Sequence, residues 1–416
     1  KTDDPLQYEL VSTNTSTNGE IIPNISKTDI TGTSIELGSG KFAKANNASH
    51  TYELKIYYPK KTTSQNANQG AAFSAHVEIT SAKAPTVSTL AQTILAKNEV
   101  KAPITTPGTA ISTADEALLA SAEDDYGTSY YFRGAVTNNY VEFANKCWRI
   151  VRVGGDGSVK LILHNDNTAG AANPCDVANN SASAAVARYS GETYKSAFNT
   201  NYNDNAYVGF KYGTAGAGDY ASAHANTNNS TILTNLETWY TNNLKTYADA
   251  IADTVWCNDK TNVTDTSYNP WGRSNLTGLG YAKNVTYYGA TQRLVSTSGS
   301  AGGTGPSLKC NGDLSKINSK VGLITADELA FAGYAYGLKN TTTYLQENAT
   351  DTYWWSLSPS YFTGSVAIVC YVGGSNGDFG YSNVVYTHAV RPSISLKPST
   401  NVTGDGTSSS PFVVKI

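Results

Sequence analysis

Alternating apolar and polar positions mark the first part of the chain. In "HTYELKIYYP" (residues 50–59), Tyr52, Leu54, Ile56 and Tyr58 fall on one face of an extended segment. In "FSAHVEIT" (73–80) the apolar positions again recur every second residue. This period predicts half-buried antiparallel strands, and the upstream runs "QYELVS" and "GTSIEL" predict more of them. We therefore expect a small β-sandwich over residues 1–82.

The pattern changes over residues 83–120, which contain three prolines and two helical stretches. In "TLAQTILAKN", Leu90 and Ile94 lie at helical spacing. "STADEALLASAE" begins with capping-box spacing, because Ser112 or Thr113 is followed three residues later by an acidic residue. This composition predicts a linker with short helices between two domains.

Residues 121–416 alternate strand and helix patterns, with long Gly- and Asn-rich stretches between them. The clearest helix is "STILTNLETWYTNNL", where Ser230 or Thr231 serves as N-cap and Ile232, Leu236 and Trp239 share one face. A second helix is predicted at "TADELAFAG". The fold class expected for the whole chain is mainly β and α+β, the larger domain being α+β with long loops.

Composition favours an exported protein. Charged residues make up 15 % of the chain and the net charge is −3. We therefore expect no basic surface and no nucleic-acid partner. No apolar run reaches the roughly 18–20 residues of a membrane span. The first residue is Lys1 and the chain has no Met, which is typical of a processed, secreted protein. We expect an extracellular, cell-surface location.

The five cysteines contain no CxxC pair, so disulfides are the natural expectation in an exported chain. The first expected bridge is Cys257–Cys310, and the second is Cys147–Cys370, both of whose cysteines lie in predicted strands. Cys175 would then be free or would join a neighbouring subunit. Sequence does not fix this connectivity, and unpaired buried thiols remain the alternative.

The order "HTYELKIYYP…QNANQGAAFSAHVEIT" resembles the last two strands of the biofilm-fibre and camelysin family of secreted β-sandwiches. The resemblance implies polymerisation by donation of an N-terminal strand to a neighbouring copy. The segment "KTDDPLQYELVS" would play that part here, burying Leu6, Tyr8 and Leu10 in the neighbour. The alternative is an ordinary first strand that pairs within its own domain.

The pattern "YWWSLSPSYF…VAIVCYVGGSNGDFG…THAVRPSISL" resembles C-type-lectin-like domains and formylglycine-generating-enzyme-like surface domains of Gram-positive bacteria. That resemblance implies a displayed ligand-binding domain. The enzymes of this type need two reactive cysteines near the C-terminus, and only Cys370 lies there. The Glu-Pro-Asn and Gln-Pro-Asp tripeptides of calcium-dependent sugar sites do not occur. We therefore do not expect an enzyme.

The stretch "DTYWWSLSPSYF" holds five aromatic residues among twelve. In a strand, Trp354 and Trp355 point to opposite faces, so we expect one of them in the core and the other at a loop or the surface. If the segment binds a ligand, aromatic faces would stack on sugar rings or on peptide aromatics. The candidate ligand contacts are Trp355, Tyr361, Tyr371, Asn376, Asp378 and Tyr381. The alternative is that the segment is mainly core.

No resident cofactor is predicted. The Asp/Asn clusters at residues 164–167, 201–205 and 375–380 could hold Ca²⁺ through hard oxygen ligands, but Asx-rich turns are the commoner explanation of such clusters. The five histidines occur singly and no catalytic motif stands in a fitting context. The leading expectation is a surface-filament subunit that partners with itself and displays a lectin-like domain for adhesion. The alternatives are a monomeric adhesin for glycan or protein and, less favoured, a formylglycine-generating-type enzyme.

Overall fold

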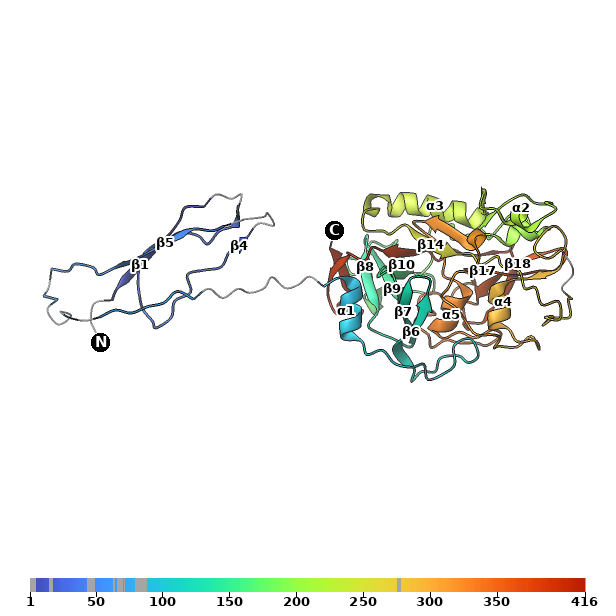
Figure 1. The fold of residues 1–416 in the computed structure, drawn as a ribbon, viewed down its shortest axis with the longest axis horizontal. Coiled ribbons are helices and arrows are strands. Elements are labelled where there is room, and N and C mark those ends of the chain that lie inside the picture. Colours follow the sequence, from blue (N-terminus) through green and yellow to red (C-terminus); the bar gives the residue numbers. More distant parts are fainter. Residues whose placement is uncertain are drawn as a thin grey trace. The chain divides into compact units, whose positions relative to one another are not determined.

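The computed structural model describes residues 5–14, 18–42, 49–62, 64–65, 70, 72–78, 88–274 and 278–415. The chain divides into two units, Lys1–Ala82 and Lys83–Ile416, which we call the N-terminal and C-terminal units (Figure 1). Strands dominate both, so the expected mainly β and α+β class is confirmed. No helix within the described ranges is long and apolar enough to cross a membrane.

The N-terminal unit contains a three-stranded antiparallel sheet in the order β3-β1-β5, made of β1 (Gln7–Ser12), β3 (Ile25–Asp29) and β5 (Tyr52–Tyr57). Tyr8 lies opposite Ile56 and Leu10 opposite Leu54, and both Tyr8 and Leu10 are buried. Strand β1 is therefore the central strand of its own sheet, because its alternation matches that of β5. This is the alternative that the sequence left open, a first strand paired within its own domain.

The expected sandwich is seen only in part. A two-stranded pair of β2 (Gly19–Glu20) and β4 (Lys41–Phe42) accompanies the sheet. Residues 72–78 form no strand, and Phe73 and Val77 are exposed, so the strand predicted at 73–80 is wrong for its described part; Ile79 lies outside the described residues. Alternation alone does not make a strand when no neighbour among the described residues supplies the hydrogen bonds. A second packed layer is thus not seen in the described part of this unit.

The C-terminal unit is built on two large sheets. The first has eight strands, in the order β21-β10-β9-β8-β23-β22 with the β6–β7 hairpin joined to β9. Its strands are β6 (Ala117–Asp124), β7 (Gly127–Gly134), β8 (Tyr140–Phe143), β9 (Lys146–Val153), β10 (Val159–Asn165), β21 (Ser393–Leu396), β22 (Asn401–Thr403) and β23 (Phe412–Lys415).

The second sheet has six strands, in the order β11-β20-β17-β18-β19 with β15 paired to β17. They are β11 (Lys195–Ala197), β15 (Thr286–Tyr287), β17 (Trp354–Phe362), β18 (Ala367–Val372), β19 (Phe379–Asn383) and β20 (Thr387–Ala389). Two small sheets pair β12 (Lys211–Tyr212) with β13 (Asn228–Asn229) and β14 (Thr254–Cys257) with β16 (Lys316–Ser319).

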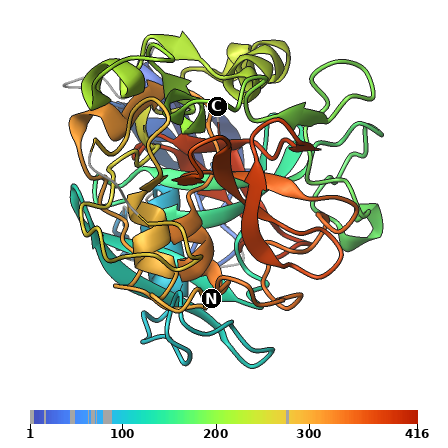
Figure 2. The same ribbon diagram turned by 90° about the vertical axis from the view of Figure 1, so that its right-hand side faces the viewer.

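Short helices cover these sheets. They are α1 (Leu90–Lys97), α2 (Tyr220–His224), α3 (Thr231–Asn243), α4 (Gly289–Leu294) and α5 (Ala326–Ala332), with 3₁₀ turns η3 (Val177–Asn179), η4 (Asn205–Val208), η5 (Lys245–Tyr247) and η6 (Asp313–Ser315). Helix α3 begins after Ser230, whose side chain caps it, and α5 begins after the capping box of Thr325 and Glu328. Helices α4 and α5 pack on β17, and Figure 2 shows them in orange beside red strands of the same unit.

The first short helix expected within residues 83–120 is confirmed as α1, but the described part of this range packs within the C-terminal unit and does not stand apart as a linker. Leu90 and Ile94 of α1 are buried, and the Leu90 amide donates to the Thr400 carbonyl at 2.7 Å. The second predicted helix is instead strand β6, paired along its length with β7. Glu116, expected to close a capping box, accepts hydrogen bonds from Thr105 Oγ1 at 2.6 Å and Arg133 Nε at 2.8 Å. Tertiary partners therefore override the local signal.

Five tryptophans are fully buried in the C-terminal unit: Trp148, Trp239, Trp256, Trp354 and Trp355. The expectation that one of Trp354 and Trp355 faces a loop or the surface is wrong, because both faces of β17 are covered along the whole strand. Trp355 donates its indole N–H to the Ser196 carbonyl at 2.8 Å, which satisfies its polar atom.

Candidate functional site

A shallow hollow on the second sheet of the C-terminal unit brings together aromatic side chains that are far apart in sequence. We call it the aromatic groove. Its volume is about 590 Å³. The residues that line it are Arg273, Tyr353, Tyr361, Thr363, Ser365, Val366, Ile368, Tyr371, Tyr381, Ser382, Asn383, Tyr386 and His388.

Strand pairing explains how these side chains meet. Strand β17 pairs with β18 so that Tyr361 lies opposite Ile368, and β18 pairs with β19 so that Tyr371 lies opposite Gly380. Each strand thus carries a tyrosine to the same region, while Gly380 adds no side chain beside Tyr371. The groove is a product of register rather than of one segment.

At one end of the groove, the rings of Trp271, Tyr361 and Tyr381 pack against one another. The ring centroids of Trp271 and Tyr361 lie 4.6 Å apart, those of Trp271 and Tyr381 4.8 Å, and those of Tyr361 and Tyr381 5.1 Å. The Tyr361–Tyr381 pair is T-shaped, an arrangement that aromatic pairs prefer. These mutual contacts hold the rings in place before any ligand arrives.

At the other end, His388 lies among Tyr353, Tyr371 and the buried Trp355. Its ring centroid is 4.4 Å from that of Trp355, 5.4 Å from Tyr353 and 5.5 Å from Tyr371. His388 Nε2 is hydrogen-bonded to Ser382 Oγ at 2.8 Å. Burial, with a smaller effect of Lys195, lowers the pKa of His388 to about 4. The imidazole is therefore neutral at neutral pH.

The hydroxyls of Tyr361 and Tyr371 also stay neutral at neutral pH. Burial raises the pKa of Tyr371 to about 12, with a further contribution from Asp378, and burial raises the pKa of Tyr361 as well. Tyr353 and Tyr386 are 49 % and 60 % exposed. The groove therefore offers ring faces together with hydroxyls that can both donate and accept hydrogen bonds.

The six candidate contacts predicted from sequence separate in the structure. Tyr361, Tyr371 and Tyr381 line the groove. Trp355 does not reach the surface and supports His388 from below. Asn376 and Asp378 form the turn between β18 and β19, where the Asp378 amide donates to Asn376 Oδ1 at 3.1 Å. These two residues shape the hairpin and do not line the groove.

Sequence reasoning missed Arg273, Tyr353, Tyr386 and His388. Tyr353 belongs to the aromatic stretch at residues 351–362, but it is not among the six candidate contacts predicted from sequence. Arg273 lies in the excursion between Cys257 and Cys310, and nothing in its local sequence places it near β17. Only the pairing of β15 with β17 brings that excursion to the groove.

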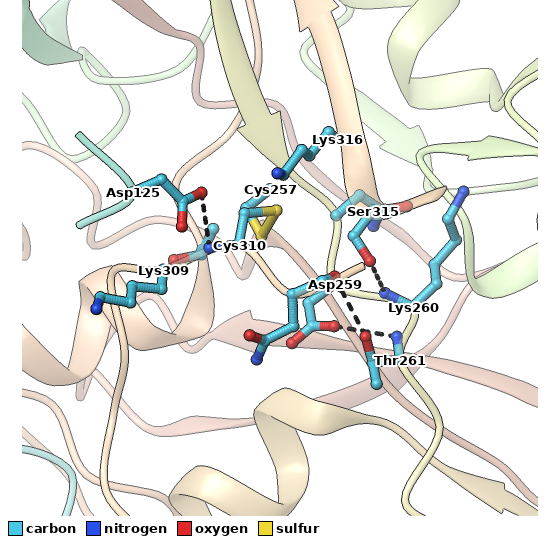
Figure 3. The surroundings of a disulfide bond; sticks show 12 residues. Asp125, Cys257, Asp259, Lys260, Thr261, Lys309, Cys310, Ser315 and Lys316 are labelled. Atoms are coloured by element: carbon cyan, nitrogen blue, oxygen red, sulfur yellow. Dashed lines mark hydrogen bonds between the residues drawn. A yellow bond between two sulfur atoms is a disulfide. The ribbon is translucent and has the colours of Figure 1, made fainter. Parts of the chain in front are cut away.

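A second hollow, which we call the charged cleft, lies beside the Cys257–Cys310 bridge and has a volume of about 280 Å³. Figure 3 shows Asp125, whose carboxylate accepts a hydrogen bond from the Cys310 amide at 3.2 Å, with Asp259 and Thr261 also around the bridge. Arg293 joins Asp259 and Asp327, both at 2.7 Å.

A buried carboxylate, Glu328, anchors the other wall of the charged cleft. It lies 2.6 Å from Lys160 Nζ and 2.9 Å from Arg152 Nε. Burial alone would raise the pKa of Glu328, but Lys160 and Arg152 outweigh it and hold the pKa at about 2. These cations and carboxylates thus form ion pairs with one another, and the ion pairs stabilise the unit.

The disulfides differ from the expectation at one position. Cys257 pairs with Cys310, the first bridge expected from sequence. Cys147 pairs with Cys175 rather than with Cys370, so the Cys147–Cys370 bridge and the free Cys175 are wrong. Asn165 Nδ2 donates to the Pro174 carbonyl at 3.1 Å and holds Cys175 against β9, whereas Cys370 is buried in the other large sheet. Two disulfides fit an extracellular protein.

The Asp/Asn clusters considered for Ca²⁺ form turns. The Asn167 amide donates to Asn165 Oδ1 at 2.8 Å, and the Ala206 amide donates to Asp204 Oδ1 at 3.0 Å. Within the described ranges, no group of three or more His, Cys, Asp or Glu side chains is placed to hold a metal ion.

Comparisons with protein-family models, curated proteins and solved structures found no match. The resemblances to fibre subunits and to lectin-like domains therefore stay predictions.

Proposed function

We propose that this chain is an extracellular binding protein that holds a saccharide in the aromatic groove of its C-terminal unit. The observation that carries the proposal is a hollow of about 590 Å³ lined by five tyrosines and a neutral histidine. Tyrosine supplies a rigid, flat contact surface with a polar tip, and so suits ligands that have both apolar faces and hydroxyls, as sugar rings do.

The arrangement of the rings supports a binding role over a purely internal one. Tyr353 and Tyr386 keep large parts of their rings in solvent, although apolar ring surface gains free energy when it is covered. The inner rings, such as Tyr361, are already fixed by Trp271 and Tyr381. A ligand would therefore meet a surface that needs little ordering on binding.

The test is saccharide binding by the full chain, with substitution of one exposed groove tyrosine. Tyr386→Ala should raise Kd about fivefold to tenfold, the size of one lost aromatic contact of roughly 1 kcal/mol. Tyr126→Ala is a matched control, because Tyr126 is also 60 % exposed but lies at the charged cleft. Equal effects of the two substitutions would count against the groove as the binding site.

A second candidate function, self-assembly, is favoured by the N-terminal unit. Its sheet ends in two edge strands, β3 and β5, and its exposed side chains include Phe42, Ile56 and Phe73. Open edges can accept a strand from another chain. Because β1 is already central, the acceptor would be β3 or β5, and the donor would be another segment of a neighbouring copy.

Negative-stain electron microscopy tests assembly. We expect fibres from the full chain at high concentration and none after deletion of residues 1–82. Fibres formed by the deleted chain would place assembly in the C-terminal unit, and dispersed particles of the full chain would remove the assembly role.

A further inference from the structure

The aromatic groove has an unusual balance of charge. Among its thirteen lining residues there is one arginine, Arg273, and no aspartate or glutamate, and His388 is neutral at neutral pH. The charged cleft of the same unit is lined by seven carboxylates and four cationic side chains. The two hollows therefore differ in the charge of their linings.

Arg273 also differs from the other arginines of the chain. Arg133, Arg149, Arg152 and Arg293 form ion pairs, Arg391 donates to backbone carbonyls, and Arg188 lies over the Tyr194 ring. Arg273 is exposed, and its guanidinium has no ion pair among the described residues. Its backbone is held, because its carbonyl accepts a hydrogen bond from the Tyr287 hydroxyl at 2.8 Å.

Arg273 lines the same hollow as Tyr361, Tyr371 and the other groove tyrosines. Burial raises the pKa of Tyr361, and the positive charge of Arg273 opposes that rise. The lining of the groove therefore combines tyrosine ring faces with one cation and no carboxylate.

From this charge balance we infer that the groove binds an acidic saccharide, with the carboxylate of a sugar ring on Arg273 and neutral rings over the groove tyrosines. This rests on the proposed saccharide-binding function and adds the class of the ligand. The planar fork of a guanidinium matches a carboxylate with two parallel hydrogen bonds, and such charge-assisted bonds are stronger than neutral ones.

The experiment is a printed array in which each acidic saccharide stands beside its carboxyl-reduced counterpart. The array carries hexuronate-, sialate- and sulfate-bearing chains, and the probe is the labelled full chain. We expect the carboxylated members to bind roughly tenfold or more tightly than their reduced partners, the size of one charge-assisted contact. Arg273→Gln should remove that preference and keep the binding to reduced partners, and Arg273→Lys should restore part of it.

Lys245→Gln is the matched control, because it removes one exposed positive charge outside the groove and should leave the preference intact. Tryptophan fluorescence and thermal unfolding of each variant establish that it is folded. Equal binding of acidic and reduced partners would overturn the acidic-saccharide inference and leave the proposed function standing. Preference for sulfate over carboxylate would also overturn it. Failure to bind any saccharide on the array would remove both the inference and the proposed function.

Discussion

The two units of this chain use apolar residues in opposite ways. In the N-terminal unit, Tyr8 and Leu10 are the buried hydrophobic residues among those described, while Ile56, Phe73 and Val77 stay exposed. The C-terminal unit buries five tryptophans completely and adds two disulfides and several buried ion pairs. Few side chains in the described part of the N-terminal unit are therefore buried, and the self-assembly proposed above would cover those that are exposed.

The largest expected effect comes from the disulfides, which occur in the C-terminal unit alone. They close loops with sequence separations of 28 and 53, and the chain-entropy relation gives roughly 4 kcal/mol for each. Replacing all four cysteines by serine should lower the free energy of unfolding of this unit by roughly 7 kcal/mol. Urea unfolding followed by tryptophan fluorescence measures it, since all six tryptophans lie beyond residue 82. A loss below about 2 kcal/mol would contradict the cross-linked picture.

The next effect concerns a buried ion pair. Arg133 Nε lies 2.8 Å from Glu116, and both side chains are fully buried. Arg133→Met would leave the Glu116 carboxylate uncompensated and should cost about 3–5 kcal/mol in urea unfolding. The control is Lys101→Met, which breaks the exposed Lys101–Glu99 pair and should cost about 0.5 kcal/mol or less. Similar losses for the two variants would contradict the buried network.

A pH dependence follows from Glu328. Its folded pKa is about 2, below the ordinary value of 4.5, so its carboxylate form stabilises the C-terminal unit at pH values above about 4.5. This contribution, about 3 kcal/mol, should be lost as the pH falls through 2. Glu328→Gln should flatten the stability profile between pH 4.5 and 2, as measured by urea unfolding at each pH. An unchanged profile would show that Lys160 and Arg152 do not hold Glu328 as described.

The smallest effect is expected in the N-terminal unit. Ile56 is 42 % exposed, so Ile56→Ser should change the stability of the isolated monomer by about 0.5 kcal/mol or less, measured by circular dichroism. The same substitution should weaken self-association, measured by sedimentation velocity, if the exposed face is an assembly surface. Leu10→Ser, at a buried neighbour in the same sheet, should destabilise the monomer itself. Equal losses of monomer stability for Ile56→Ser and Leu10→Ser would contradict the difference in burial between the two side chains.

An element is predicted correctly from sequence where the residues that determine it lie close together along the chain. Helix α3 begins after Ser230, and the side chains at its predicted spacing, Ile232, Leu236 and Trp239, are buried. The helix predicted at 112–123 is wrong because Glu116 accepts a hydrogen bond from Arg133 and so does not cap a helix. Arg133 reaches Glu116 through the pairing of β6 with β7, which the local sequence does not reveal. The same limit applies to Cys147, whose partner is decided by a loop that Asn165 holds.

The residues of the aromatic groove divide in the same way, into those that lie close together in sequence and those that long-range pairing brings there. Tyr361, Tyr371 and Tyr381 could be predicted because they come from one aromatic region that reads as adjacent strands. Arg273 could not be predicted, because it reaches the groove through the pairing of β15 with β17. Trp355 was misplaced because sequence does not reveal that β17 is covered on both faces.

Cys370 has a consequence for how the chain is made. Burial raises the pKa of its thiol to about 12, so in the finished protein it is not a nucleophile. Before the second sheet closes around it, the same thiol has an ordinary reactivity and can attack a nascent bridge. The yield of correctly bridged protein thus depends on whether β17, β18 and β19 bury Cys370 before the other four cysteines form their disulfides. An oxidative refolding reaction should gain yield when Cys370 is replaced by serine.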